Sequence, residues 1–320
     1  MCGASSDDAR WTAESLIGAA VSGHPSDGVQ RVIEHATACL AGTVDPAAQP
    51  VIRPVTRVIV DVDGCHGLGQ VVARAAADAC VEIARAEGLG LAFVRHCGML
   101  GRLSDVVERI ADGGCVGIVA ANAAGAGQVV APPGTRAARL STNPIAIAVP
   151  RAAPPHFVFD MATSVVSWGT LLHQRAAGLE IPFEWLAETD SGEPALLPAA
   201  GHKGFGLALA VEIAAGVLTG AGHSREGQGE ASEQGVVVAA LDPSCLPVSG
   251  TFVDDVESML AYVRSAPAAP GSTVRFPGEG SWERRSRDGA IVEVERGVWD
   301  ALLATAARAG IRPPRPRTAQ

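Results

Sequence analysis

The chain has 320 residues, 48% of them hydrophobic and 18% charged, and a formal net charge of −9. This composition predicts a folded protein with a sizeable core, and the acidic balance without a dense basic patch argues against a nucleic-acid surface. Seven cysteines at irregular spacings, with no Cys-x-x-Cys pair and no zinc-ligand pattern, favour reduced thiols and a cytoplasmic location.

The first half of the chain alternates predicted helices and strands. In chain order, the segments are helices 8–22 and 27–41, strand 55–64, helix 68–88, strand 89–96, helix 103–114 and strand 115–122. A β-α-β-α-β order is typical of parallel strands covered by helices. The sequence therefore predicts an α/β fold with a largely parallel sheet.

The second half is predicted to add further strands and helices. Strands are expected at 144–150, 156–162 and 235–241, and helices at 205–219, 254–265 and 296–309. Residues 176–199 are predicted to be rich in loops, and the tail 311–320 to be disordered. The apolar stretch 204–222 contains Glu212 and several glycines, so we interpret it as a buried helix and expect no membrane span.

Residues 201–206, GHKGFG, contain the only lysine of the chain, while the other cationic side chains are arginines. The glycines let the backbone approach a ligand closely, and the helix that follows presents free N–H groups to an anion. Lys203 would add a compact cation. A surface lysine at a glycine turn is the alternative, and the scarcity of lysine favours the functional interpretation.

Two other regions are weaker candidates. Residues 64–70, GCHGLGQ, join a strand to a helix, but their G-x-x-G-x-G spacing departs from the dinucleotide-binding G-x-G-x-x-G. Residues 140–150 and 157–169 place small polar side chains at strand ends, where they could contact a cofactor or form ordinary turns. His96 ends a strand, where α/β proteins place chemistry, although a lone histidine is equally often structural.

Several segments together resemble a known family, the malate/L-lactate dehydrogenase-like NAD(P)-dependent oxidoreductases, which are unrelated to the Rossmann-fold enzymes of similar name. The similarity lies in STNPIAIAVP, FDMATS, GHKGFGLAL, FPGE and the loop DGCHGLGQVVA, and it extends in order from about Ala13 to Gly310. The resemblance implies a family-specific α/β fold with a central mixed sheet and a helical subdomain built from both termini. It further implies a homodimer with its active site near the subunit interface.

The resemblance also implies a division of the chain and a set of cofactor contacts. Residues 1–54 with 275–320 would form the helical subdomain for dimerisation and substrate, and 55–274 the cofactor-binding domain. The residues expected to bind NAD or NADP are Asn122, Asp160, Met161, Ala162, Thr163, Ser164, His202, Lys203, Gly204, Gly278 and Glu279. A serine of the family that helps to hold the cofactor would be replaced here by Ala123.

The catalytic motifs of the family are altered in this chain. The family's N-H-F-G histidine, which exchanges the substrate proton, is matched with His96 at the cost of a gap of about three residues. Its S-H-G-x-x-R motif corresponds to Ser26, Asp27, Gly28 and Arg31, so aspartate replaces the histidine. Arg31 is expected to bind the substrate carboxylate. His24 is a possible substitute for the missing histidine.

These features lead to two hypotheses. The first is a dehydrogenase or reductase that transfers hydride to or from a small carboxylate, such as a cyclic imino acid or a 2-oxo acid, in specialised biosynthesis. Here His96, Ser26 and Asp27 would be catalytic, and Arg31 and His24 would bind substrate. The second is a non-redox descendant, either a lyase, an isomerase or a binding protein. The intact cofactor segments favour the first hypothesis.

Overall fold

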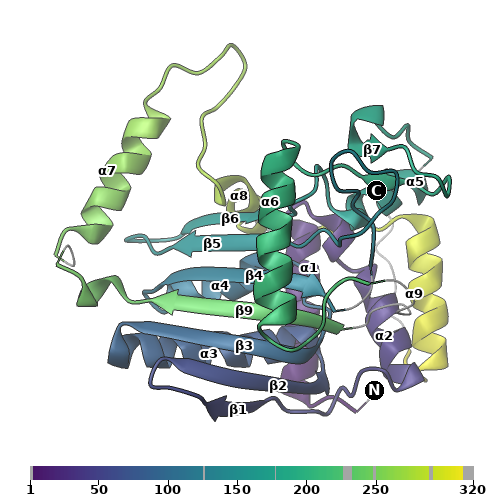
Figure 1. Ribbon diagram of the computed structural model, residues 1–320, viewed down its shortest axis with the longest axis horizontal. Helices are drawn as coiled ribbons and strands as arrows, with labels where there is room; N and C mark the ends of the chain where they lie inside the picture. Colours follow the sequence, from purple (N-terminus) through teal and green to yellow (C-terminus); the bar gives the residue numbers. More distant parts are fainter. Residues whose placement is uncertain are drawn as a thin grey trace.

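A seven-stranded sheet forms the centre of the molecule, with the strand order β1-β2-β3-β9-β4-β5-β6 (Figure 1). The computed structural model describes residues 3–124, 127–176, 178–225, 233–247, 250–287 and 291–312, so the tail predicted to be disordered lies largely outside the described residues. The strands are β1 (Val51–Pro54), β2 (Ile59–Gly67), β3 (Leu89–Gly98), β4 (Val116–Ala123), β5 (Ile145–Val149), β6 (Phe157–Met161) and β9 (Glu233–Leu241).

The sheet is mixed, as the family resemblance implies, and the prediction of a largely parallel sheet is wrong. Only β2 and β3 pair in parallel, whereas β9 lies between β3 and β4 and is antiparallel to both. The β-α-β rule fails for β4 because a strand from more than a hundred residues later occupies the position next to β3. Long-range pairing of this kind leaves no local signal in the sequence.

Helices cover both faces of the sheet. On one face, α3 (Gly69–Glu87) and α4 (Ser104–Asp112) enclose the main core, in which Val62, Val94 and Val236 are fully buried. On the other face, α6 (His202–Val211) continues into a π-helix, η3 (Glu212–Val217), which packs on β4 and β9 (Figure 1). The predicted buried helix at 205–219 is thus two helical segments. Its outer side is open, since Ile213 and Val217 are each 55% exposed.

The helices from the two ends of the chain contact one another. Helix α1 (Ser6–Val21) packs against α8 (Glu279–Arg285), and α2 (Arg31–Ala41) packs against α9 (Arg296–Arg308). Between α1 and α2 the chain forms a short 3-10 turn, η1 (Pro25–Asp27), instead of the predicted start of a helix at residue 27. This turn brings residues 24–31 towards the end of β6.

A smaller apolar cluster lies beside the sheet, around the buried Leu171 and Leu196. Its other buried members are Val130, Leu140 and Ala208. Helix α5 (Trp168–Ala176) contributes Leu171, and the predicted loop-rich region contributes η2 (Phe183–Trp185), β7 (Leu186–Ala187) and β8 (Ala195–Leu196). After η4 (Pro243–Cys245), helix α7 (Phe252–Arg264) extends away from the sheet (Figure 1). Among the described residues, none of the helices combines the length and the apolar character needed to cross a membrane.

Candidate active site

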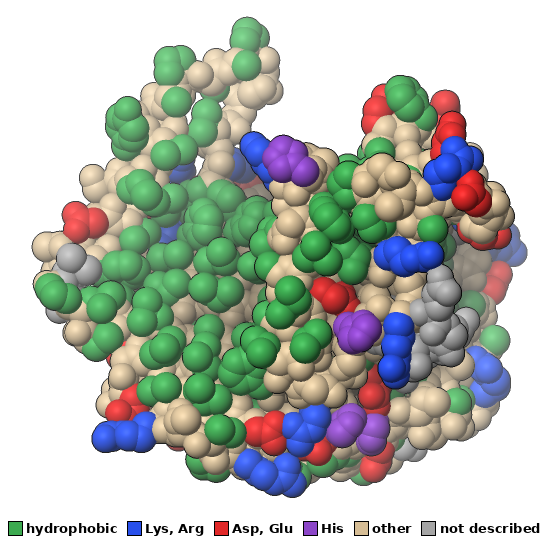
Figure 2. Space-filling model, viewed as in Figure 1, with side chains coloured by type: hydrophobic (Ala, Val, Ile, Leu, Met, Phe, Trp, Pro, Cys, Tyr) green, Lys and Arg blue, Asp and Glu red, His purple; other side chains and the backbone are tan. Residues whose placement is uncertain are grey.

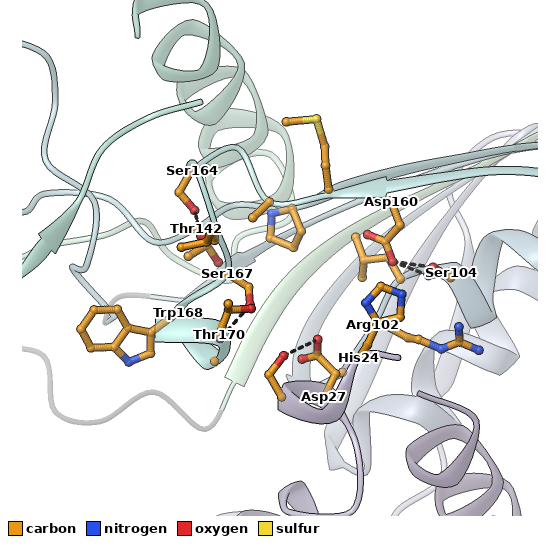
Figure 3. A pocket seen from close by; sticks show the side chains of 18 of the residues that line it. His24, Asp27, Arg102, Ser104, Thr142, Asp160, Ser164, Ser167, Trp168 and Thr170 are labelled. Atoms are coloured by element: carbon orange, nitrogen blue, oxygen red, sulfur yellow. Dashed lines mark hydrogen bonds between the residues drawn. The ribbon is translucent and has the colours of Figure 1, made fainter. Parts of the chain in front are cut away.

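A cavity of about 770 Å³ lies where the N-terminal helices meet the ends of β4, β6 and β9. Figure 3 shows His24, Arg102, Ser104 and Asp160 grouped on one side and Thr142, Ser164, Ser167, Trp168 and Thr170 on the other. Its volume is within the range of roughly 300–1,000 Å³ that is usual for small-molecule sites. The polar and charged side chains that line this cavity come from segments far apart in the chain.

Asp160, at the end of β6, is held by Ser104 at the start of α4. Both the backbone N–H and the hydroxyl of Ser104 donate to Oδ2 of Asp160, at 2.8 and 2.7 Å. Burial raises the pKa of Asp160, and the nearby Asp27 carboxylate adds to this rise, whereas the two bonds from Ser104 oppose it. The cavity therefore contains a carboxyl group with an unusual readiness to carry a proton.

His24 is the one histidine that lines the cavity within the described part of the chain. It follows α1, and its Nε2 lies 3.4 Å from Oγ of Ser281 on α8. Burial lowers its pKa and the guanidinium of Arg102 lowers it further, while Asp27 and Asp160 act in the opposite direction. The imidazole is thus mainly neutral at pH 7, next to a carboxyl whose pKa is raised.

Arg31 lies at the start of α2, and its side chain is only 14% exposed. Its Nε donates to the carbonyl of Ser26 at 2.8 Å, and its Nη1 contacts both carboxylate oxygens of Glu34 at 2.7 and 2.6 Å. Nη2 lies 4.0 Å from Asp27. The fit is close, because a Cβ on Gly169 would come within 2.9 Å of this nitrogen. Two carboxylates therefore already share the cation predicted to bind substrate.

The other wall of the cavity is formed by the two segments that the sequence singled out. Thr163 donates its backbone N–H and its hydroxyl to the carbonyl of Thr142, at 2.8 and 2.9 Å, and so joins them. Met161, Ala162 and Ser164 line the cavity, while Thr163 itself is buried behind them. Gly278 also lines it, and Glu279 stabilises the preceding turn by accepting the N–H of Phe276 at 3.0 Å.

The GHKG segment lies beside this wall without facing the cavity. Gly204 packs so tightly that a Cβ would meet the carbonyl of Ala199 at 2.2 Å. His202 and Lys203 occupy the exposed first turn of α6 and are not among the residues that line the cavity. Asn122 is also absent from the lining, because it is fully buried and its side chain bonds to Glu212.

His96 lies outside the cavity lining. Its backbone has a φ of +49°, and its Nδ1 lies 3.0 Å from Asp63 while its ring stacks on His66. Met99, three residues later, does line the cavity. Neither position that the resemblance assigns to a family histidine therefore places a histidine in the cavity, because residue 27 is aspartate and His96 lies outside the lining.

Sequence reasoning missed Arg102 and Ser104, which both line the cavity, whereas the lining residues 167–169 belong to the segment 157–169 that it had selected. Arg102 is buried and forms an ion pair with Asp105, and its Nη1 lies 3.3 Å from Oγ of Ser22. No motif marks Arg102 or Ser104, but both lie within eight residues of His96, which the sequence had selected.

Comparisons with known proteins agree with this architecture. The family model for malate/L-lactate dehydrogenase matches residues 1–303. The chain is 33% identical to Δ1-pyrroline-2-carboxylate reductase 1 of Burkholderia ambifaria over 87% of this chain and 84% of the relative. It is 30% identical to L-lactate dehydrogenase of Cupriavidus necator over 92% of this chain and 89% of the relative.

A solved structure is also similar over nearly the whole chain. Sulfolactate dehydrogenase of Methanocaldococcus jannaschii superimposes with a TM-score of 0.85 and 27% identity, covering 97% of this chain and 93% of the other. The mixed sheet, the cavity at its edge and the matched residues all lead to one assignment. This chain belongs to the malate/L-lactate dehydrogenase family of NAD(P)-dependent oxidoreductases.

Proposed function

We propose that this protein reduces a small carboxylate-bearing substrate. The best candidate is a cyclic imino acid, which has a nitrogen at the reacting carbon, and the alternative is a 2-oxo acid. A role in specialised biosynthesis is part of the proposal. The observation that carries it is the position of Asp27, which replaces the family histidine, beside Arg31 in the lining of the cavity.

The cavity suits a nicotinamide dinucleotide, NADH or NADPH, which would supply the hydride. Its wall combines the hydroxyls of Ser141, Thr142 and Ser167 with the apolar surfaces of Met161 and Trp168. Hydroxyl groups can bind the sugar and amide groups of such a molecule, and apolar surfaces can pack on its rings. These segments would hold and orient the cofactor while the remaining residues handle the substrate.

The charges around Arg31 favour a substrate with a cationic nitrogen. Asp27 and Glu34 already neutralise much of the guanidinium, so a simple dicarboxylate would meet two like charges. An imino acid offers a carboxylate to Arg31 and an iminium nitrogen to Asp27, which satisfies both partners. The Burkholderia ambifaria relative, named as a pyrroline-2-carboxylate reductase, supports the same substrate class.

The aspartate in place of the family histidine at position 27 is also easier to reconcile with an imine. An iminium already carries the proton and the positive charge, so hydride addition to its carbon gives the amine directly. A 2-oxo acid instead needs one proton on its oxygen for each hydride. We propose that His24, the histidine that lines the cavity, donates that proton to the substrate. Asp160, whose pKa is raised, would then return a proton to His24.

A substrate panel tests this function. Cyclic imino acids, 2-oxo acids and 2-hydroxy acids are assayed with both nicotinamide cofactors, and cofactor binding is followed by nicotinamide fluorescence. We expect the highest kcat/KM with a cyclic imino acid. Robust malate or lactate turnover without imine activity would show that Asp27 does not select a cationic nitrogen. Absence of binding of either cofactor would favour the non-redox alternative.

We further propose that the protein is a homodimer. Figure 2 shows a broad hydrophobic area on the face that carries α6 and β9. The elements on this side carry exposed apolar side chains, among them Ile118 of β4 at 42% and Ile213 of η3 at 55%. Exposed apolar patches of this kind typically mark interfaces. Sedimentation is expected to give twice the mass of the chain, and a monomer at micromolar concentration would refute the dimer.

A further inference from the structure

A buried carboxylate lies directly behind the cavity wall. Glu212, where α6 passes into η3, is only 6% exposed. Its Oε1 accepts from Nδ2 of Asn122 at 3.2 Å and from the backbone N–H of Ser224 at 2.6 Å. Its Oε2 accepts from Nδ2 of Asn143 at 2.7 Å. These partners are neutral amide N–H groups, and all three donate to the carboxyl oxygens of Glu212.

Two glycines allow Glu212 to reach these partners. A Cβ on Gly216 would lie 2.5 Å from Nδ2 of Asn122, and a Cβ on Gly235 would lie 1.9 Å from the carbonyl oxygen of Ala215. The missing side chains therefore let the π-helix pack directly against β4 and β9. A π-helical turn such as η3 contains one residue more than an α-helical turn, and turns of this kind are frequent at functional sites.

Two of the three partners of Glu212, Asn122 and Asn143, are adjacent to residues that line the cavity. Asn143 lies between Thr142 and Pro144, which both line it. Asn122 precedes Ala123, and its Oδ1 accepts the N–H of Gly235 at 3.1 Å, next to Gln234. The carboxylate thus connects three stretches of the wall that are far apart in the sequence: the end of β4, residues 141–144 and the start of β9.

We propose that Glu212 is a positioning residue, which holds the cofactor-facing wall of the cavity in shape through Asn122 and Asn143. The inference rests on the proposed function for the identity of the ligand, a nicotinamide dinucleotide. Glu212 acts without touching that ligand. It also gives Asn122, expected from the sequence to bind cofactor, an indirect role in that binding.

The test is the isosteric substitution Glu212→Gln. The carboxyl oxygens of Glu212 accept from three N–H donors, on Asn122, Asn143 and Ser224. A glutamine side chain must turn its NH₂ group towards at least one of them, so that two donors face each other and a hydrogen bond is lost. We expect the dissociation constant for NADH or NADPH to rise about tenfold, while the KM for the carboxylate substrate changes by less than about twofold. Hydrogen exchange should become faster at residues 141–144 and 233–236.

Val81→Ala is the matched control, since Val81 lies on the buried face of α3 in the main core, away from the network. It should lower the melting temperature without changing cofactor affinity or exchange in the two segments. If Glu212→Gln behaves in the same way as this control, the positioning role is refuted. If Glu212→Gln does not fold, Asn122→Ala, which removes one donor to Glu212, is expected to give the same pattern.

The exchange measurement separates this inference from the proposed function. A wild-type protein that binds neither dinucleotide would refute the proposed function but not the network. In that case, faster exchange confined to residues 141–144 and 233–236 in Glu212→Gln would still support the positioning role. A uniform change across the sheet, or none in those segments, would refute it.

Discussion

Replacing His24 with glutamine should separate the two candidate substrate classes. Glutamine can still hydrogen-bond Ser281, but it cannot carry a proton. Because His24 is the histidine that lines the cavity, its loss should lower kcat/KM for reduction of a 2-oxo acid by roughly 100- to 10,000-fold, the range for general acid–base catalysis. For a cyclic imino acid, which needs no added proton, the loss should stay within about tenfold.

The pH dependence follows from the lowered pKa of His24. Reduction of a 2-oxo acid requires the imidazolium, so kcat/KM should fall as the pH rises through a pKa below the ordinary 6.5. Asp27→Asn removes a carboxylate that raises this pKa, and should therefore move the fall in kcat/KM to still lower pH. Steady-state kinetics from pH 5 to pH 8 would record both effects.

His96→Gln is the matched control, because His96 bonds to Asp63 outside the cavity lining. Its kcat/KM should remain within about threefold of the wild-type value. The reasoning would be refuted if His96→Gln lost activity on a 2-oxo acid while His24→Gln retained it. In that case the proton donor would be His96, the residue that the sequence analysis indicated.

Two further predictions concern the cofactor and the stability of the fold. If the exposed Lys203 contacts the cofactor, Lys203→Ala should weaken NADH or NADPH binding about tenfold, as for loss of a hydrogen bond to a charged group, and an unchanged fluorescence titration would remove it from the site. Burial lowers the pKa of His35 to about 4, so between pH 6.5 and 4 the unfolded chain binds a proton that the folded protein does not, and stability falls with the pH. Urea unfolding should show up to about 3 kcal/mol less loss over this range in His35→Gln than in the wild type, and equal losses would exclude this role.

The sequence by itself determined the local elements and the family. Strand-like runs followed by glycine turns located β2 and β3, and the amphipathic spacing at 68–88 located α3, because these signals depend on neighbouring residues alone. Ordered motifs likewise indicated the 141–144 and 160–164 segments, which the structure joins through Thr142 and Thr163. The charge of Glu212 within an apolar stretch already set that residue apart.

Tertiary structure alone decided the strand order and the residues that meet in the cavity. The insertion of β9 between β3 and β4 depends on pairing across the whole chain, which no local pattern records. His24 reaches the cavity because the turn after α1 faces Ser104 and Asp160, whereas the left-handed backbone of His96 directs its ring to Asp63. The partners of Glu212 come from strands and loops far apart in sequence, and only packing brings their amides to one carboxylate.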